Sequence, residues 1–96
     1  MRPSCVEKLS QIISRVDDDA ELNILLEGLL TPHELEEAMT RWQLLVMLET
    51  GVTQRDIAKH LGISLGKIAR GSRLLKYGPT EFERLFRKIA GELGDL

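Results

Sequence analysis

The segment of residues 31–50 constrains the fold more than any other part of this sequence. Thr31 is placed as an N-cap, Pro32 falls in the first turn and Glu34 completes a capping box, so the segment is predicted to be a helix. Residues 44–48 (LLVML) make that helix apolar on every side, and such a helix has to be buried. A chain of 96 residues builds only a modest core on its own. We therefore expect a second subunit to cover this helix and form a dimer.

Five further segments carry helical patterns, and no segment alternates as a strand would. The acidic run 17–19 separates the first two helices, Gly62 makes a turn between the fourth and fifth, and Pro79 ends the fifth. Thr80 and Glu83 form a second capping box, which predicts Thr80 as the cap of the last helix. The sequence thus predicts an all-α fold of six helices in a single domain, residues 1–96, with helices at about 4–16, 20–28, 31–50, 53–61, 64–75 and 80–93.

Several classes of protein are not expected from this sequence. Its longest apolar run is far shorter than a membrane span and it has no signal-peptide pattern, so we expect a cytoplasmic protein without membrane contact. Cys5 is the only cysteine, which leaves no disulfide framework and no CxxC pattern, and we expect no metal. No nucleophile with its base, P-loop or dinucleotide fingerprint is present, so an enzyme is not expected.

Positive charge is concentrated in one segment of the chain. The formal net charge is −2, but residues 51–76 carry six basic side chains and one acidic, whereas residues 1–50 carry four basic and ten acidic. This local excess attracts phosphate although the chain as a whole is acidic. A patch of this kind suits a gated DNA binder better than a protein that coats DNA.

The basic segment coincides with the pattern of a helix-turn-helix at about residues 53–75. A short helix capped by Thr53 and a second helix capped by Ser64 flank the turn at Gly62, with the small Ala58 where the helices must approach. Basic side chains fall on the outer side of both helices, as a phosphate-facing surface requires. The pattern alone also fits an ordinary antiparallel helix pair, but the near absence of acidic residues favours DNA.

The start of the second of these helices is chemically poor for reading bases. Ser64, Leu65, Gly66 and Lys67 offer one hydroxyl and one ammonium, but no amide or guanidinium fork. Specificity then depends on water, the backbone and DNA shape. Gly66 inside a helix costs about 1 kcal/mol relative to alanine, and either close approach to DNA or local mobility explains it.

Four short motifs stand out along the chain, and they are Leu29-Leu30-Thr31-Pro32, Thr40-Arg41, Thr53-Gln54-Arg55 and Ile68-Ala69-Arg70-Gly71-Ser72. Taken together, they resemble the Trp repressor family, which is built on a helix-turn-helix. The likeness covers about residues 22–90, and the combination is specific although each motif alone is weak.

The resemblance implies an intertwined homodimer in which L-tryptophan, as corepressor, sets the spacing of two DNA-reading heads on a palindromic operator. The two arginines that sandwich the indole correspond to Arg41 and Arg70, and the carboxylate is held by Arg70 and Thr31. The ammonium group faces carbonyls that correspond to Gly28 and Leu30. These residue types suit the ligand, because a helix C-terminus attracts an ammonium and guanidinium planes stack on an indole.

The resemblance also places two more residues in the ligand site. The resemblance and the positive charges together place eight residues at the DNA. Gly71 belongs to the arginine motif, and Leu74 stands where the family pattern implies a serine beside the ammonium. The implied function is a transcriptional repressor of tryptophan biosynthesis or salvage genes. The predicted DNA contacts are Gln54, Arg55, Ser64, Gly66, Lys67 and Ala69 from the resemblance, with Lys59 and Arg73 from the outward positive charge.

Two other functions remain open at this point. One is a ligand-independent helix-turn-helix module of the sigma-factor kind, and the other is a helical protein-interaction module without DNA. Operator binding measured with and without tryptophan separates all three.

Overall fold

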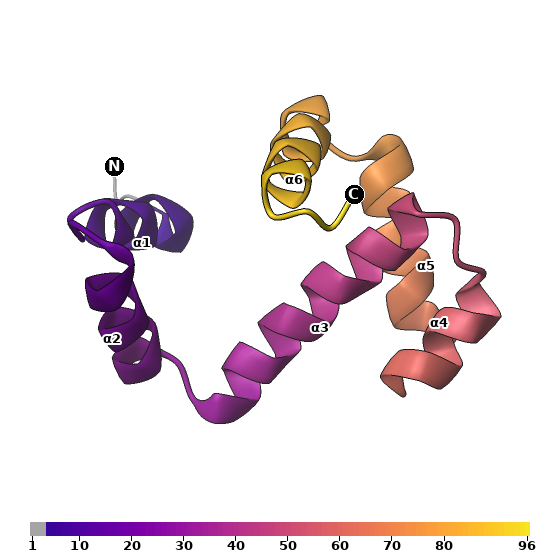
Figure 1. Cartoon of the computed structure of the whole chain (residues 1–96), viewed down its shortest axis with the longest axis horizontal. Helices are drawn as coiled ribbons and strands as arrows, with labels where there is room; N and C mark the ends of the chain where they lie inside the picture. The colour runs from indigo at the N-terminus through magenta and orange to yellow at the C-terminus, as the bar shows by residue number, and fades with distance from the viewer. Residues whose placement is uncertain (1–3) are drawn as a thin grey trace. The chain divides into compact units, whose positions relative to one another are not determined.

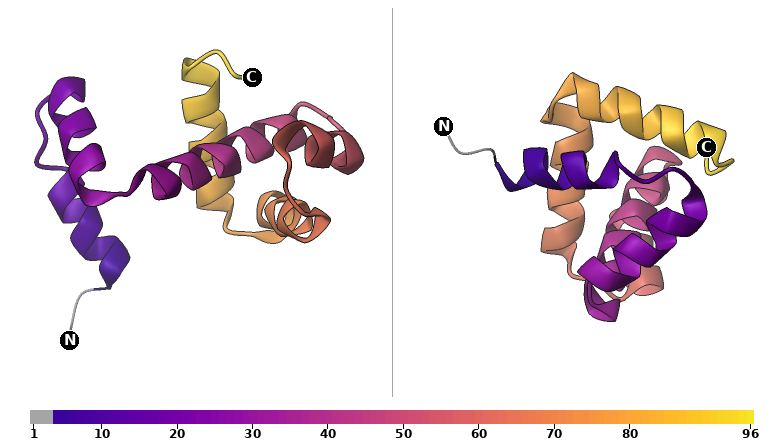
Figure 2. Two further views of the ribbon diagram at one scale, coloured as in Figure 1. Left: turned by 90° about the horizontal axis from the view of Figure 1, so that it is seen from below. Right: turned by 90° about the vertical axis from the view of Figure 1, so that its left-hand side faces the viewer.

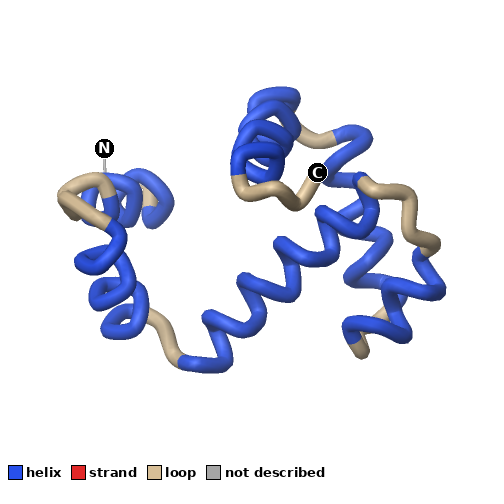
Figure 3. The backbone as a smooth tube through the Cα atoms, in the orientation of Figure 1, coloured by secondary structure: helices blue, strands red, loops and turns tan. Residues whose placement is uncertain are grey.

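The computed structural model describes residues 4–96, and every regular element within them is a helix (Figures 1 and 3). This confirms the all-α, six-helix array and the order of its elements. The fifth helix runs two residues farther than predicted, and the first ends three residues earlier. The helices are α1 (Cys5–Ile13), α2 (Asp19–Leu29), α3 (Pro32–Glu49), α4 (Gln54–Leu61), α5 (Leu65–Tyr77) and α6 (Thr80–Glu92).

Side-chain caps start three of these helices where the sequence predicts them. The capping box of α3 is complete, because the Thr31 N–H donates to Glu34 Oε1 at 2.9 Å and the Glu34 N–H donates to Thr31 Oγ1 at 3.1 Å. Thr53 and Ser64 accept a backbone N–H in the same way at the starts of α4 and α5, each at 3.2 Å. Each such cap is worth about 1 kcal/mol to the helix that it starts.

Two helix starts differ from the prediction. Thr80 does not cap α6, because it is already the first helical residue, and Pro79 at the cap position makes no side-chain hydrogen bond. The predicted capping box fails since the Pro79 carbonyl accepts two N–H groups of the first turn and so begins the helix earlier. α2 has a cap that the sequence analysis missed, for Asp18 in the acidic run accepts the Glu21 N–H at 2.9 Å.

Contacts divide the chain into two compact units, one ending at Glu36 and the other formed by Glu37–Leu96. The N-terminal unit holds α1, α2 and the first turn of α3, and none of its described side chains is buried. Large apolar side chains are exposed instead, with Val6 of α1 at 74% and Ile24 of α2 at 73%. This unit therefore has apolar surface that it does not cover itself.

The C-terminal unit packs α4, α5 and α6 around the second half of α3 (Figures 1 and 2). Two clusters of buried side chains form its core, and each contains one buried residue of α3. Because successive residues of a helix point about 100° apart, neighbouring leucines of α3 face different sides. The buried members are Leu44, Ile57 and Ile68 in the first group, the α4–α5 cluster, and Leu45, Phe86 and Ala90 in the second, the α6 cluster.

The chain itself covers much of the apolar run 44–48. Three residues of the run belong to the α4–α5 cluster and two belong to the α6 cluster. The sequence analysis assigned this burial to a second subunit, but the short helices that follow α3 flank the run on more than one side and bury Leu44 and Leu45. Val46 and Met47 stay half-buried and line an open hollow. The prediction of a dimer therefore has to rest on the apolar surface that the chain leaves uncovered.

The capping box of α3 generates a prediction about pH. Hydrogen bonds from Thr31, above all from its backbone N–H, hold the pKa of the Glu34 carboxylate below its usual value. A carboxylate with a lowered folded-state pKa stabilises the fold above its unfolded-state pKa, and the stabilisation is lost as the pH falls through the lowered value. Glu34→Gln keeps the capping geometry but does not titrate.

We expect the stability of the wild-type protein to fall relative to Glu34→Gln as the pH is lowered from neutral through the range in which glutamate titrates. Urea unfolding of both proteins at a series of pH values measures the difference in free energy of unfolding. Glu36→Gln, on an exposed carboxylate of the same helix that makes no capping bond, is the control. A difference between wild type and Glu34→Gln that does not change with pH would contradict the prediction.

Candidate DNA interface and ligand site

α4 and α5 form the predicted helix-turn-helix. Gly62 makes the turn with a φ of 65°, a left-handed conformation that favours glycine. Ile57 of α4 and Ile68 of α5 are fully buried, and Ala58, Leu61 and Ile63 pack against them. The pair is held against α3 through the α4–α5 cluster, so the outer surfaces of both helices are left to solvent.

The basic side chains of these two helices are exposed and unpaired. None forms an ion pair within residues 4–96, whereas Arg87 of α6 is bound by Glu49 and Glu83, each at 2.8 Å. The positive charge of α4 and α5 is therefore not neutralised by ion pairs within residues 4–96. It is available to an anionic partner. These residues are Arg55, Lys59, Lys67, Arg70, Arg73 and Lys76.

The structure places the predicted DNA contacts along the two helices of the motif. Gln54 and Arg55 lie in the first turn of α4 and Lys59 lies in its last turn. Ser64 caps α5, and its Oγ is engaged by the Lys67 N–H. All eight predicted positions are exposed except Ala69, which is half-buried; the others are Gln54, Arg55, Lys59, Ser64, Gly66, Lys67 and Arg73.

Packing within the protein does not require glycine at position 66. A Cβ atom built on Gly66 would meet nothing nearer than Ser64 Oγ, at an ordinary 3.9 Å. Gly66 is exposed in the first turn of α5. The reason for a glycine here therefore lies outside the packing of the folded chain.

Two predicted ligand groups are unpaired backbone carbonyls at the end of α2. The carbonyl of Gly28 has no helical partner because Pro32, four residues on, has no N–H. The carbonyl of Leu30 has none because the Glu34 N–H is taken by Thr31. Within residues 4–96 these two oxygens accept no hydrogen bond. The end of α2 thus presents partial negative charge that suits a cation.

The two arginines keep donors available, whereas Thr31 is engaged in its capping box. Thr31 Oγ1 accepts the Glu34 N–H, and its hydroxyl also interacts with the Glu34 carboxylate, which helps to lower the pKa of that carboxylate. Arg41 and Arg70 are exposed and form no ion pair within the described residues.

Gly71 and Leu74 have packing roles that the sequence analysis did not foresee. A Cβ atom at Gly71 would lie 3.1 Å from Leu44 Cδ2 and 3.5 Å from Leu48 Cδ1, so the glycine lets α5 approach α3 closely. Leu74 packs against the α6 cluster. The predicted ligand set draws on both units, with Gly28, Leu30 and Thr31 in the N-terminal unit and Arg41, Arg70, Gly71 and Leu74 in the C-terminal one.

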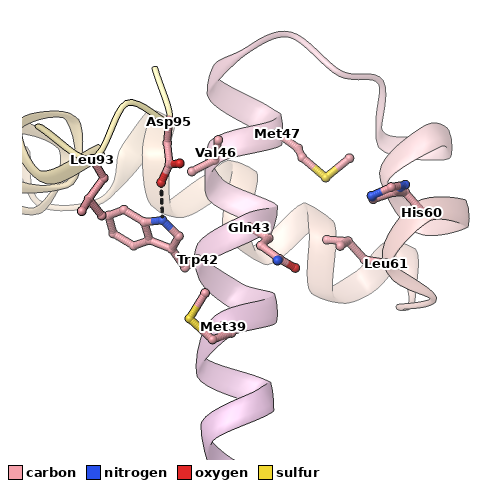
Figure 4. Close-up of a pocket in the computed structure, with 9 residues that line it drawn as sticks. All are labelled: Met39, Trp42, Gln43, Val46, Met47, His60, Leu61, Leu93 and Asp95. Carbon is pink, nitrogen blue, oxygen red and sulfur yellow. Dashed lines mark hydrogen bonds between the residues drawn. The ribbon is translucent and has the colours of Figure 1, made fainter. Parts of the chain in front are cut away.

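A separate hollow of about 370 Å³ lies along α3 in the C-terminal unit (Figure 4). Its lining is mostly apolar and contains none of the predicted ligand residues. On one side, the indole N–H of Trp42 donates to Asp95 Oδ2 at 3.1 Å, and the ring packs edge-on against Phe86 with centroids 5.1 Å apart. On the other side, His60 and Leu61 of α4 form the wall. The hollow is an apolar part of α3 that the C-terminal unit leaves open.

Two further findings concern the described residues. No group of three or more His, Cys, Asp or Glu side chains among residues 4–96 is arranged to hold a metal ion. No helix in this part of the chain has the length and apolar character needed to cross a membrane.

Comparison with known proteins places this arrangement in a family. The family described as "Trp repressor protein" matches residues 4–90. The chain belongs to the Trp repressor family. The match begins at residue 4 and so includes α1, which lies outside the resemblance drawn from the motifs. Members of this family are transcriptional repressors rather than enzymes, and the chain is accordingly a Trp-repressor-like DNA-binding regulator.

Relatives named "Trp operon repressor homolog" support this assignment. One from Xylella fastidiosa (strain M23) is 33% identical over 76 residues, 78% of this chain and 83% of the relative. One from Chlamydia trachomatis serovar L2 is 30% identical over 78 residues, 80% and 83% of the two chains. One from Pasteurella multocida (strain Pm70) is 39% identical over 59 residues, 60% and 58% of the two chains. No solved structure matches the chain.

The open surroundings of Gly66 generate a prediction about stability. We expect Gly66→Ala to raise the free energy of unfolding by about 0.5–1 kcal/mol, because alanine restricts the unfolded chain and the folded chain has room for the methyl group. Gly91→Ala in α6, where an added Cβ meets nothing within 4 Å, should give a similar gain and serves as the matched control. Urea unfolding measures both, and a loss of stability in Gly66→Ala alone would contradict the prediction.

Proposed function

We propose that this protein is a transcriptional repressor that binds operator DNA when L-tryptophan is bound, and that it controls genes of tryptophan biosynthesis or salvage. The observation that carries the proposal is the unpaired basic surface on α4 and α5, in a chain whose family and relatives are named as Trp repressors. We propose the cytoplasm as its location, since operator DNA and free tryptophan meet there.

The geometry of the motif supports DNA binding through α5. The N-terminal end of α5 enters the major groove, as the second helix of such motifs does, and α4 lies across the phosphate backbone. Exposed Arg55 and Lys59 on α4 and Lys67 on α5 contact phosphates, which makes the affinity depend steeply on salt. Specificity comes from backbone groups, water and DNA shape more than from forked side chains.

The chemistry of the predicted ligand set matches each part of L-tryptophan. A carboxylate suits the exposed guanidinium of Arg70 and the hydroxyl of Thr31, and an ammonium group suits the unpaired carbonyls of Gly28 and Leu30. An indole ring suits the guanidinium planes of Arg41 and Arg70. When bound, tryptophan supplies a flat apolar ring and one charge of each sign to arginines and carbonyls that have no partner within residues 4–96.

A homodimer accounts for the apolar surfaces that each chain leaves uncovered. α1 presents Val6, Leu9 and Ile13 to solvent, and its unit has no buried described side chain. The C-terminal unit has the apolar hollow beside Trp42 (Figure 4). Apolar helix faces that are exposed together are unfavourable in water, and a second copy supplies matching surface. We propose that the two copies bury these faces against each other.

Operator binding with and without tryptophan tests the proposed function. The full chain is used to select duplexes from a random library in the presence of L-tryptophan, and the affinity for the selected duplex is then measured by fluorescence anisotropy. We expect tight binding only with tryptophan. Equal binding with and without it would indicate a ligand-independent DNA-binding module, and the absence of any selected duplex would indicate a protein-interaction module.

Removing one face of the proposed indole site should weaken ligand binding. We expect Arg41→Ala to reduce tryptophan affinity by about 2- to 30-fold, because one cation–π contact is lost, without lowering the melting temperature of the free protein. Titration calorimetry measures the affinity. Arg84→Ala, which removes an exposed arginine of α6, is the control and should leave it unchanged. Wild-type affinity in Arg41→Ala would remove this residue from the site.

The proposed dimer should be visible in its melting behaviour. Because association stabilises the folded state by mass action, we expect the melting temperature to rise with protein concentration. Leu9→Asp places a charge on the apolar face of α1 and should produce monomers in analytical ultracentrifugation. Gln11→Asp, an exposed polar position of the same helix, should leave the dimer intact. A monomeric wild type whose melting temperature is independent of concentration would refute the dimer.

A further inference from the structure

Leu65 is a large apolar side chain exposed at the functional end of the helix-turn-helix. It is the first residue of α5 and is 58% exposed. It belongs to neither hydrophobic cluster, although Ile68, one turn later, is fully buried at the centre of the α4–α5 cluster. The packing of the folded chain therefore gives no reason for a leucine at this position.

Few side chains beside Leu65 are able to reach a base, so Leu65 is a main candidate for a base contact from the first turn of α5. Gly66 has no side chain and Ala69 is half-buried, while the Lys67 N–H holds the Ser64 oxygen at the helix cap and leaves only its hydroxyl hydrogen to donate. Besides this short hydroxyl and the flexible ammonium of Lys67, the first turn of α5 presents apolar surface. The major groove displays one apolar group on its base edges, which is the C5-methyl group of thymine.

We propose that Leu65 reads thymine methyl groups in the major groove and so helps to determine which operator this protein selects. The inference rests on the proposed function, since it needs α5 to lie in the groove. It also accounts for Gly66, because a neighbour without a side chain allows the backbone beside Leu65 to come close to the base edges.

Deoxyuridine tests this contact at the level of one methyl group, because it pairs like thymidine but lacks the C5-methyl. Each thymine of the selected duplex is replaced in turn, and the affinity of the tryptophan-loaded protein is measured by fluorescence anisotropy. We expect one position in each half-site at which the replacement weakens wild-type binding by about fourfold, the value of one buried methyl group. Leu65→Ala should bind the normal duplex more weakly and show no effect of deoxyuridine at that position.

Two variants control for other causes. Leu65→Met keeps an apolar side chain of similar reach and should remain sensitive to the methyl group. Leu96→Ala removes an exposed leucine outside the motif and should behave as the wild type does. Circular dichroism melts of each variant verify that it is folded.

The outcomes separate this inference from the proposed function. Loss of methyl sensitivity in Leu65→Ala but not in Leu65→Met supports it. A selected duplex without any methyl-sensitive thymine, or sensitivity that persists in Leu65→Ala, overturns the inference and leaves the proposed function standing. Failure to select any duplex overturns both.

Discussion

The packing of α3 between the α4–α5 cluster and the α6 cluster is the interaction on which the rest of the C-terminal unit depends. Leu44 and Leu45 are adjacent in sequence, yet each is buried in a different cluster. α4, α5 and α6 are too short to be stable alone and acquire their stability from this shared helix. Gly71 completes the arrangement, because it lets α5 come within van der Waals contact of Leu44 and Leu48.

This packing explains how an acidic chain presents a basic surface. The apolar sides of α4 and α5 are held inward by Ile57 and Ile68, so their charged sides face solvent and form no ion pair with an acidic side chain of residues 4–96. The acidic residues lie mainly in the first fifty positions of the chain. Net charge is therefore a poor guide to the partner of this protein, and the distribution of charge over the folded elements is the relevant quantity.

The N-terminal unit has the opposite character, since none of its described side chains is buried. It supplies caps, unpaired carbonyls and exposed apolar residues rather than a core. Three of the predicted ligand groups lie in this unit and four in the other.

The sequence by itself determined the features that depend on residues near one another in the chain. These include the capping box of Thr31 with Glu34, the caps at Thr53 and Ser64, the turn at Gly62 and the basic faces of α4 and α5, because caps and amphipathic faces are local properties. Only the tertiary structure decided which surfaces cover the run 44–48, that Gly71 and Leu74 pack against other helices, and that Leu65 stays exposed. These depend on which elements meet in space, and helical periodicity shows that a face must be buried but not what buries it.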